Sequence, residues 1–248
     1  MRFSDHFSGV ASDYAAFRPQ YPVELFKWLA SVCPRHDVVW DCACGSGQAS
    51  GSLATFFDWV VGTDASLSQI ALAEATVTSQ FAVAASEQAP LRNGTVDLVA
   101  VGAALHWFAG EPFFAEVRRV LRPGGVFAAW SYGMPKIDSD EVTRAVYGFI
   151  DGLLGPFWPP EIRMVLDGYA SISLPFEELE SPAFELKTKW PLERFLGFAR
   201  TWSAVGRYVE DRGEDPVLTL AAELEEVWHD AEALLPVSYR LDLRAGRV

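Results

Sequence analysis

The stretch V-V-W-D-C-A-C-G-S-G-Q-A-S, residues 38–50, decides how this chain folds. An apolar run of β-forming residues ends in Asp41, a turn with Gly45 and Gly47 follows, and the next residues can open a helix. Glycines in such a turn let backbone amides meet a ligand, because no side chain stands in the way. The order therefore predicts a strand, a tight turn and a helix N-terminus that together face a ligand.

A second apolar run, W-V-V-G-T-D at residues 59–64, also ends in an acid, Asp64. This acid follows the first glycine of the turn by about 20 residues, the spacing typical of dinucleotide-binding folds. In doubly wound folds, an acid at the tip of the second strand accepts hydrogen bonds from a ribose. The glycine turn and Asp64 together predict a cofactor that contains adenosine.

Strands and helices should alternate through the first half of the chain. The patterns predict strands at 38–41, 60–64, 81–84, 96–101 and 126–130, and helices at 23–32, 47–57, 66–75 and 111–121. The strands are continuously apolar rather than alternating, so both faces of the sheet should be covered. This order is typical of an α/β protein with a parallel sheet and right-handed crossovers.

The pattern changes after Trp130. We expect helices at 141–154, 163–168, 192–205 and 217–235, irregular chain at 155–160, and strands at 183–189 and 237–248. The two strands complete a doubly wound, mostly parallel, seven-stranded sheet. We interpret residues 1–248 as one domain, with 132–182 as a helical insertion that covers the active site at the open end of the sheet.

The composition limits the partners of the protein. Half of the 248 residues are hydrophobic and 21% are charged, so a large core can form. The formal net charge is −13. Such an acidic surface repels phosphate backbones and anionic lipids, so we expect neither nucleic acid nor membrane as a partner. A small molecule is the expected partner.

Three cysteines, Cys33, Cys42 and Cys44, are too few and too unevenly placed for a disulfide framework. They suit a reducing compartment, and no second Cys or His pair stands at a metal-ligand spacing, so no metal site is expected. The chain shows neither a signal peptide nor an apolar run of about 18 residues. The sequence thus predicts a cytoplasmic protein.

Two enzyme classes combine a glycine turn with a distal acid. The nicotinamide fingerprint has a third glycine where Ser50 stands, which weakens the interpretation as an NAD(P)-dependent oxidoreductase without excluding it. A non-catalytic module that keeps the cofactor fold is a further alternative. The intact Gly45, Gly47 and Asp64 argue against that alternative.

Several motifs occur in the order and spacing of one family. They are D-C-A-C-G-S-G-Q at 41–48, G-T-D at 62–64, S-E-Q-A-P-L at 86–91, V-D-L-V at 96–99 and V-L-R-P-G-G at 120–125. The chain resembles the class I S-adenosylmethionine-dependent methyltransferases, within them the type 11 group of small-molecule methyltransferases. Residues 14–22 and 104–108 are similar to the subgroup that contains trans-aconitate methyltransferase.

The resemblance implies that S-adenosylmethionine is the cofactor. In such enzymes the glycines let the backbone approach the methionine moiety, one acid orients its ammonium group, and a second acid binds the ribose. The residues implied to bind the cofactor are Arg18, Asp41, Ala43, Gly45, Gly47, Asp64, Ala65, Gln69, Ser86, Glu87 and Ala103. Arg18 could instead pair with a carboxylate of the substrate. Ala43 and Ala85 depart from the family pattern, which often has glycine and aspartate there.

Four aromatic residues, Tyr14, Tyr21, Trp107 and Trp202, are expected to bind the substrate, because aromatic rings attract a positively charged ligand. Ordinary core packing is the alternative for them. His106 is the candidate catalytic base, with a role in the wall of the site as the alternative. The expected function is transfer of a methyl group to a small-molecule acceptor, by O-methylation of a carboxylate or hydroxyl. In-line displacement needs above all that two molecules be held in register.

Overall fold

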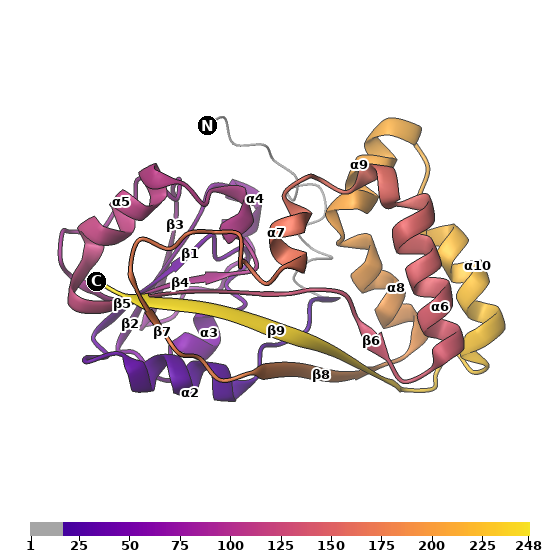
Figure 1. The fold of residues 1–248 in the computed structure, drawn as a ribbon, viewed down its shortest axis with the longest axis horizontal. Coiled ribbons are helices and arrows are strands. Elements are labelled where there is room, and N and C mark those ends of the chain that lie inside the picture. Colours follow the sequence, from indigo (N-terminus) through magenta and orange to yellow (C-terminus); the bar gives the residue numbers. More distant parts are fainter. Residues whose placement is uncertain (1–16) are drawn as a thin grey trace.

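A computed structural model describes residues 17–248, and its fold is drawn in Figure 1. The strands are β1 (Val38–Cys42), β2 (Trp59–Asp64), β3 (Ser79–Val83), β4 (Val96–Gly102), β5 (Leu121–Tyr132), β6 (Lys136–Ile137), β7 (Glu177–Leu179), β8 (Phe184–Trp190) and β9 (Leu235–Arg247). The α-helices are α2 (Val23–Val32), α3 (Ser50–Leu53), α4 (Leu67–Ile70), α5 (Glu111–Val120), α6 (Asp140–Gly148), α7 (Ile162–Leu166), α8 (Leu192–Arg200), α9 (Ser203–Arg212) and α10 (Val217–Trp228). Short turns of 3₁₀ or π-helix are η2 (Leu105–Trp107), η3 (Phe149–Leu153) and η4 (Gly155–Phe157).

The first five strands form the parallel part of the sheet, in the order β3-β2-β1-β4-β5. The order in which strands are added to the sheet reverses at β1, because β2 pairs with one edge of β1 and β4 with the other. In doubly wound sheets, ligands bind outside the carboxyl ends of the strands at such a reversal. Asp41 on β1 is in register with Ala100 on β4, so the carboxyl ends of these strands lie at the same edge.

The long strand β9 runs antiparallel to β5 and also pairs with β6, β7 and β8. Seven strands in the order β3-β2-β1-β4-β5-β9-β8 make the main sheet, and the two short strands β6 and β7 add to the edges of β9. The predicted doubly wound, mostly parallel, seven-stranded α/β fold is therefore confirmed.

Both faces of the sheet are covered, as its continuously apolar strands predict. On one face, Leu25 and Phe26 of α2 and Leu53 of α3 pack in a buried cluster with Val39 of β1. On the opposite face, Trp40 of the same strand packs with the phenylalanines of α5. Neighbouring residues of β1 thus point to opposite faces, and both are fully buried.

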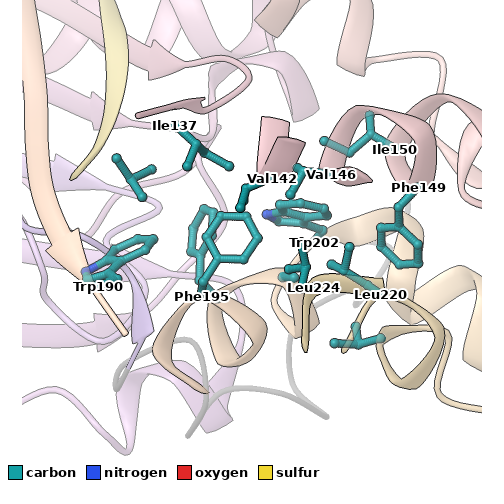
Figure 2. Packing of buried hydrophobic residues seen from close by; sticks show 14 of the residues in the cluster. Ile137, Val142, Val146, Phe149, Ile150, Trp190, Phe195, Trp202, Leu220 and Leu224 are labelled. Carbon is teal, nitrogen blue, oxygen red and sulfur yellow. The ribbon is translucent and has the colours of Figure 1, made fainter. Parts of the chain in front are cut away.

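A third hydrophobic cluster lies among the helices of the C-terminal half (Figure 2). It joins Val142 and Val146 of α6 to Phe195 of α8 and to Leu220 and Leu224 of α10. Figure 1 shows these helices beside the sheet, with α7 between them and the parallel strands β1 to β4. Helix α6, from within 132–182, therefore shares its core with helices from outside that segment. The assignment of 132–182 as an insertion stays a prediction.

Two helices after the strand tips are shorter than expected. Helix α3 covers only Ser50–Leu53 of the expected 47–57, and α4 covers only Leu67–Ile70 of the expected 66–75. Serine and glycine fill α3, and both residues favour turns over helix. The chain after α4 continues in tighter turns, in which the amides of residues 72 and 73 bond three residues back. Ser66 caps α4 by accepting a hydrogen bond from the amide of Gln69.

At the opposite, amino edge of the sheet, Asp97 holds the chain at the start of β1. Its carboxylate accepts hydrogen bonds from the amides of Asp37 and Val38, each at 2.8 Å, and pairs with Arg122. No helix in residues 17–248 is both long and apolar enough to cross a membrane.

Candidate active site

The glycine turn after β1 has a left-handed backbone conformation, which glycine adopts without steric strain. Gly45 and Gly47 have φ angles of +56° and +85°, in the left-handed region. The amide of Gly47 donates to the carbonyl of Cys44 at 2.9 Å, which closes the turn. Ala43 also lies in the left-handed region, at φ +55°, although a side chain disfavours it there. The sequence therefore maintains an unusual backbone at the tip of β1.

Asp64 ties this turn to the tip of β2. Its carboxylate accepts hydrogen bonds from the amide of Gly45 at 2.9 Å and from the amide of Ser66 at 2.8 Å. The glycine turn and Asp64 thus lie in direct contact. Ala65, between Asp64 and Ser66, is half-buried.

Asp41 is buried beneath the turn, with 1% of its surface exposed. It accepts a hydrogen bond of 2.5 Å from the hydroxyl of Ser50. Burial raises the pKa of Asp41 to about 7, and the nearby charge of Asp64 acts in the same direction. Ser50 occupies the position of the third nucleotide-fingerprint glycine, and its buried side chain is used to hold Asp41. This bond gives a structural reason for the departure from the nicotinamide pattern.

Three acids converge around the tip of β1. Burial raises the pKa of the Cys42 thiol well above its ordinary value, and the charges of Asp41, Asp64 and Glu87 raise it further. Glu87 also accepts a hydrogen bond of 3.0 Å from the hydroxyl of Ser86. A group of carboxylates at one strand tip favours a positively charged ligand there.

Gln69 on α4 lies beside the turn and has an unused polar atom. Its side-chain oxygen is buried and finds no hydrogen-bond partner among residues 17–248. A Cβ atom placed on Gly45 would be 3.6 Å from this oxygen, so the two residues are neighbours. On the other side, a Cβ atom on Gly47 would be 3.0 Å from the ring of Phe81, which braces the turn. A buried acceptor, open backbone and clustered acids fit an adenosine that carries a positive charge.

A cavity of about 100 Å³ lies further along the carboxyl edge, at the ends of β4 and β5. Ala103, just after β4, belongs to its wall and has a left-handed φ of +54°. The wall also contains four residues expected from the sequence to be in the site, which are Arg18, His106, Trp107 and Trp202. Residues from distant parts of the chain therefore meet in one cavity.

Arg18 enters this cavity from the N-terminal segment. Its guanidinium donates to the hydroxyl of Tyr132 and, at 3.4 Å, to the carbonyl of Thr201. It also lies over the rings of Tyr132 and Phe198, at 5.6 and 5.5 Å from their centroids. These contacts place a cationic group beside the cavity at the C-terminal end of β5.

His106 forms part of the cavity wall on η2. Its Nδ1 lies 3.1 Å from the hydroxyl of Tyr169, and its ring contacts Trp107 at a centroid distance of 4.6 Å. Burial, with a smaller contribution from the positive charge of Arg18, lowers the pKa of His106 to about 4. The imidazole is therefore neutral at pH 7 and a weak base.

Tyr21 does not belong to the wall of this cavity. It packs edge-on against Trp130, with ring centroids 5.5 Å apart, and its hydroxyl lies near Gly102 at the end of β4. The structure gives Tyr21 a core contact at this position. Tyr14 lies outside the described residues.

Sequence reasoning missed several residues of the cavity wall. They come from β5, the 132–182 segment, α8 and β9, and include Ser131, Tyr132, Met134, Trp158, Phe198 and Tyr239. Ser131 could have been found, because it follows the predicted fifth strand at the edge where ligands bind. The others depend on long-range packing. No group of three or more His, Cys, Asp and Glu side chains in residues 17–248 could hold a metal ion.

The fold and this edge of the sheet define a Rossmann-like enzyme that uses an adenosine cofactor. A family model described as a methyltransferase domain matches residues 40–129. A Dictyostelium discoideum protein described as a methyltransferase is 31% identical over 217 residues, which span 86% of this chain and 82% of that protein. A Saccharomyces cerevisiae protein described as an S-adenosylmethionine-dependent methyltransferase is 25% identical over 265 residues, or 92% of this chain and 91% of the relative.

A solved structure from Anaeromyxobacter dehalogenans, described as a type II methyltransferase, has a TM-score of 0.84 and 43% sequence identity. The match covers 93% of this chain and 98% of that one. The chain therefore belongs to the S-adenosylmethionine-dependent methyltransferases. This membership decides between the cofactors that the glycine turn and Asp64 left open.

Proposed function

We propose that the protein transfers a methyl group from S-adenosylmethionine to an oxygen of a small organic acceptor, a carboxylate or a hydroxyl. The observation that carries this proposal is the cavity that adjoins Ala103 and contains Arg18, His106, Trp107 and Trp202. Its wall is mostly apolar and aromatic with a few polar groups, which is typical of small-molecule sites. The resemblance to the subgroup that contains trans-aconitate methyltransferase agrees with an organic acid as acceptor.

S-adenosylmethionine, when bound, supplies a methyl group that its sulfonium has already activated. We assign the ammonium of the cofactor to Asp41 and the ribose hydroxyls to Asp64. The backbone of Gly45 and Gly47 would lie against the methionine moiety. Gln69, Ser86 and Glu87 would surround the adenine. The side-chain oxygen of Gln69, which has no partner among the described residues, can accept a hydrogen bond from the adenine amino group.

The residues of the chain then act by holding the acceptor in place and excluding water. Proximity and orientation can supply much of the rate of a displacement reaction. A carboxylate acceptor needs no base at pH 7, whereas a hydroxyl acceptor does. Since His106 is a weak base in this wall, the arrangement favours a carboxylate and gives His106 a role in shaping the cavity.

Methyl-labelled S-adenosylmethionine incubated with panels of organic acids, phenols and amines tests this proposal. We expect label in the acids first and then in the phenols, with none in the amines. The Asp64→Ala variant serves as the control for a cofactor-dependent signal. Transfer to amines alone, or to no member of the three panels, would contradict the proposal.

A further inference from the structure

His106 has one ring nitrogen held by the protein and one that is open. Its Nδ1 lies 3.1 Å from the hydroxyl of Tyr169. Its Nε2 has no hydrogen-bond partner among the described residues and is not one of their buried unpaired atoms, so this nitrogen is accessible. Since His106 lines the cavity, Nε2 is the ring nitrogen that a ligand in the cavity can reach. The tautomer of the imidazole therefore determines what His106 offers to that ligand.

The contact with Tyr169 selects the tautomer. Burial lowers the pKa of His106, so the imidazole is neutral and only one of its nitrogens carries a hydrogen. The bare nitrogen of a neutral imidazole is a strong acceptor, whereas a phenol hydroxyl is a better donor than acceptor, because its oxygen lone pairs are delocalised into the ring. The Tyr169 hydroxyl therefore donates to Nδ1, and the hydrogen of the imidazole is on Nε2.

The backbone at Tyr169 is strained, and contacts on both sides hold it. Tyr169 has a φ of +64°, in the left-handed region that a bulky residue rarely adopts. Its amide donates to the carbonyl of Met164 at 2.7 Å, and its carbonyl accepts a hydrogen bond from Arg244 at 2.5 Å. Its ring is fully buried and stacks on the ring of His106, with centroids 6.1 Å apart. Strained residues of this kind are concentrated at functional sites, which favours a role for Tyr169 beyond packing.

The rest of the cavity wall indicates what the open nitrogen binds. The described residues that line the cavity include Arg18 but neither aspartate nor glutamate. The charge of Arg18 contributes to the low pKa of His106, so the guanidinium and the imidazole act on the same region. Hydrogen-bond donors without a carboxylate favour a ligand oxygen over an amine.

We propose that Tyr169 is a positioning residue that fixes His106 with its hydrogen on Nε2, and that this N–H donates a hydrogen bond to an oxygen of the methyl acceptor. His106 then orients the acceptor as a donor and does not act as a base. In a carboxylate, one oxygen can accept this hydrogen bond while the other stays free to attack the methyl carbon. The inference rests on the proposed function, for which it supplies the residue that orients the acceptor.

The first measurement determines the tautomer without any ligand. NMR of the imidazole nitrogens in the full, isotope-labelled chain distinguishes a ring nitrogen that carries a hydrogen from one that does not. The His106→Gln variant assigns the signals of His106 among the four histidines. We expect the hydrogen on Nε2 in the wild type and a loss of this preference in Tyr169→Phe. Tyr208→Phe is the matched control with an unchanged tautomer, because its ring packs on Phe157 outside the cavity wall.

The second measurement is the binding of benzoate and of its oxygen-free analogue toluene to the full chain saturated with S-adenosylhomocysteine. Trp107, Trp158 and Trp202 line the cavity, so quenching of tryptophan fluorescence reports binding there. We expect Tyr169→Phe to weaken benzoate binding about tenfold, because the donor on Nε2 is no longer fixed. Toluene binding and the affinity for S-adenosylhomocysteine should not change.

The His106→Gln variant separates positioning from packing. A glutamine amide places an N–H near the position of Nε2 and needs no tyrosine to set a tautomer. We therefore expect benzoate affinity close to the wild-type value in His106→Gln, and no further loss when Tyr169→Phe is added to it. A tyrosine that only supports the fold would weaken benzoate binding equally in both backgrounds and would leave the tautomer unchanged.

Four results would overturn the inference. They are a hydrogen on Nδ1 in the wild type, the same tautomer in wild type and Tyr169→Phe, equal benzoate affinity in these two proteins, or no binding of benzoate to the wild type. Both measurements are made without methyl transfer. A protein that shows the expected tautomer and benzoate binding but methylates no oxygen would refute the proposed function alone.

Discussion

Asp64 has two tasks at the residue scale, since it braces the glycine turn and is assigned to the ribose. Replacement by alanine removes the acceptor for the amides of Gly45 and Ser66 together with the charge. We predict that Asp64→Ala weakens S-adenosylmethionine binding at least about tenfold, because charge-assisted hydrogen bonds are lost. Isothermal titration measures this effect. The surface variant Asp58→Ala is the control, and equal affinities in wild type and Asp64→Ala would remove Asp64 from its assigned role.

Asp41 makes the stability of the folded protein depend on pH. Its pKa of about 7 in the folded protein lies above the ordinary value of 3.8. The folded state therefore holds a proton that the unfolded state releases, so this group stabilises the fold at low pH. The stabilisation is lost as the pH rises towards 7, by up to about 1.4 kcal/mol per pH unit.

Asparagine at position 41 has no ionisable group, so its contribution to stability does not change with pH. We predict that Asp41→Asn gains stability relative to the wild type between about pH 4 and about pH 7. Urea unfolding of both proteins near the two ends of this range measures the change. A stability difference that does not vary with pH would show that Asp41 is ionised normally in the fold.

Individual residues differ in how far the sequence predicts them. Gly45, Gly47 and Asp64 are found together as expected, because their contact follows from neighbouring parallel strands with short connections. Ser131 and Tyr239 line the same cavity only because β9, at the C-terminal end of the chain, pairs with β5. Such pairing depends on the packing of the whole sheet, which no local pattern contains.

At the scale of elements, Arg244 on β9 holds the segment that follows α7. Its guanidinium donates to the carbonyls of Tyr169 and Ile172, at 2.5 and 3.1 Å, and pairs with Glu178 on β7. This segment carries the tyrosine that contacts His106. These contacts of Arg244, called the Arg244 clamp below, therefore link the end of the sheet to the cavity wall.

We predict that Arg244→Met lowers the free energy of unfolding by about 2 kcal/mol, because two partly buried carbonyls lose a charged donor. The turnover of an acceptor should fall, while the affinity for S-adenosylmethionine stays the same. Urea denaturation and cofactor titration measure the two effects. The exposed Arg240→Met is a matched control on the same strand. An unfolding free energy equal to that of the wild type would mean that the clamp does not hold this segment.

The bounds of helix α2 were predicted correctly, whereas those of the helix expected at 192–205 were not. Helix α2 has the expected bounds, because Pro22 precedes it and its apolar residues recur at helical spacing. The expected helix 192–205 is instead divided into α8 and α9 at Thr201 and Trp202. Trp202 lies in the buried helical cluster, and Arg18 bonds to the carbonyl of Thr201. Tertiary contacts thus accompany a break that helix propensity does not indicate.

At the scale of the whole molecule, the carboxyl edge of one sheet joins two regions of different character. The tips of β1 and β2 carry acids and open backbone, where the proposed function places the cofactor. The ends of β4, β5 and β9 form an aromatic cavity that contains the guanidinium of Arg18. Ala103, after β4, belongs to the edge between these regions. Under the proposed function, this arrangement would hold a cationic cofactor and an acidic acceptor side by side.

The central claim is that the glycine turn and Asp64 together bind S-adenosylmethionine. Thermal melting of the full chain, alone and with S-adenosylmethionine or NADPH, tests it most directly. A ligand at 100 times its dissociation constant stabilises the folded state by about 2.7 kcal/mol. We predict a higher melting temperature with S-adenosylmethionine, no change with NADPH, and loss of the shift in Asp64→Ala. Stabilisation by NADPH, or an equal shift in the Asp64→Ala variant, would contradict the account.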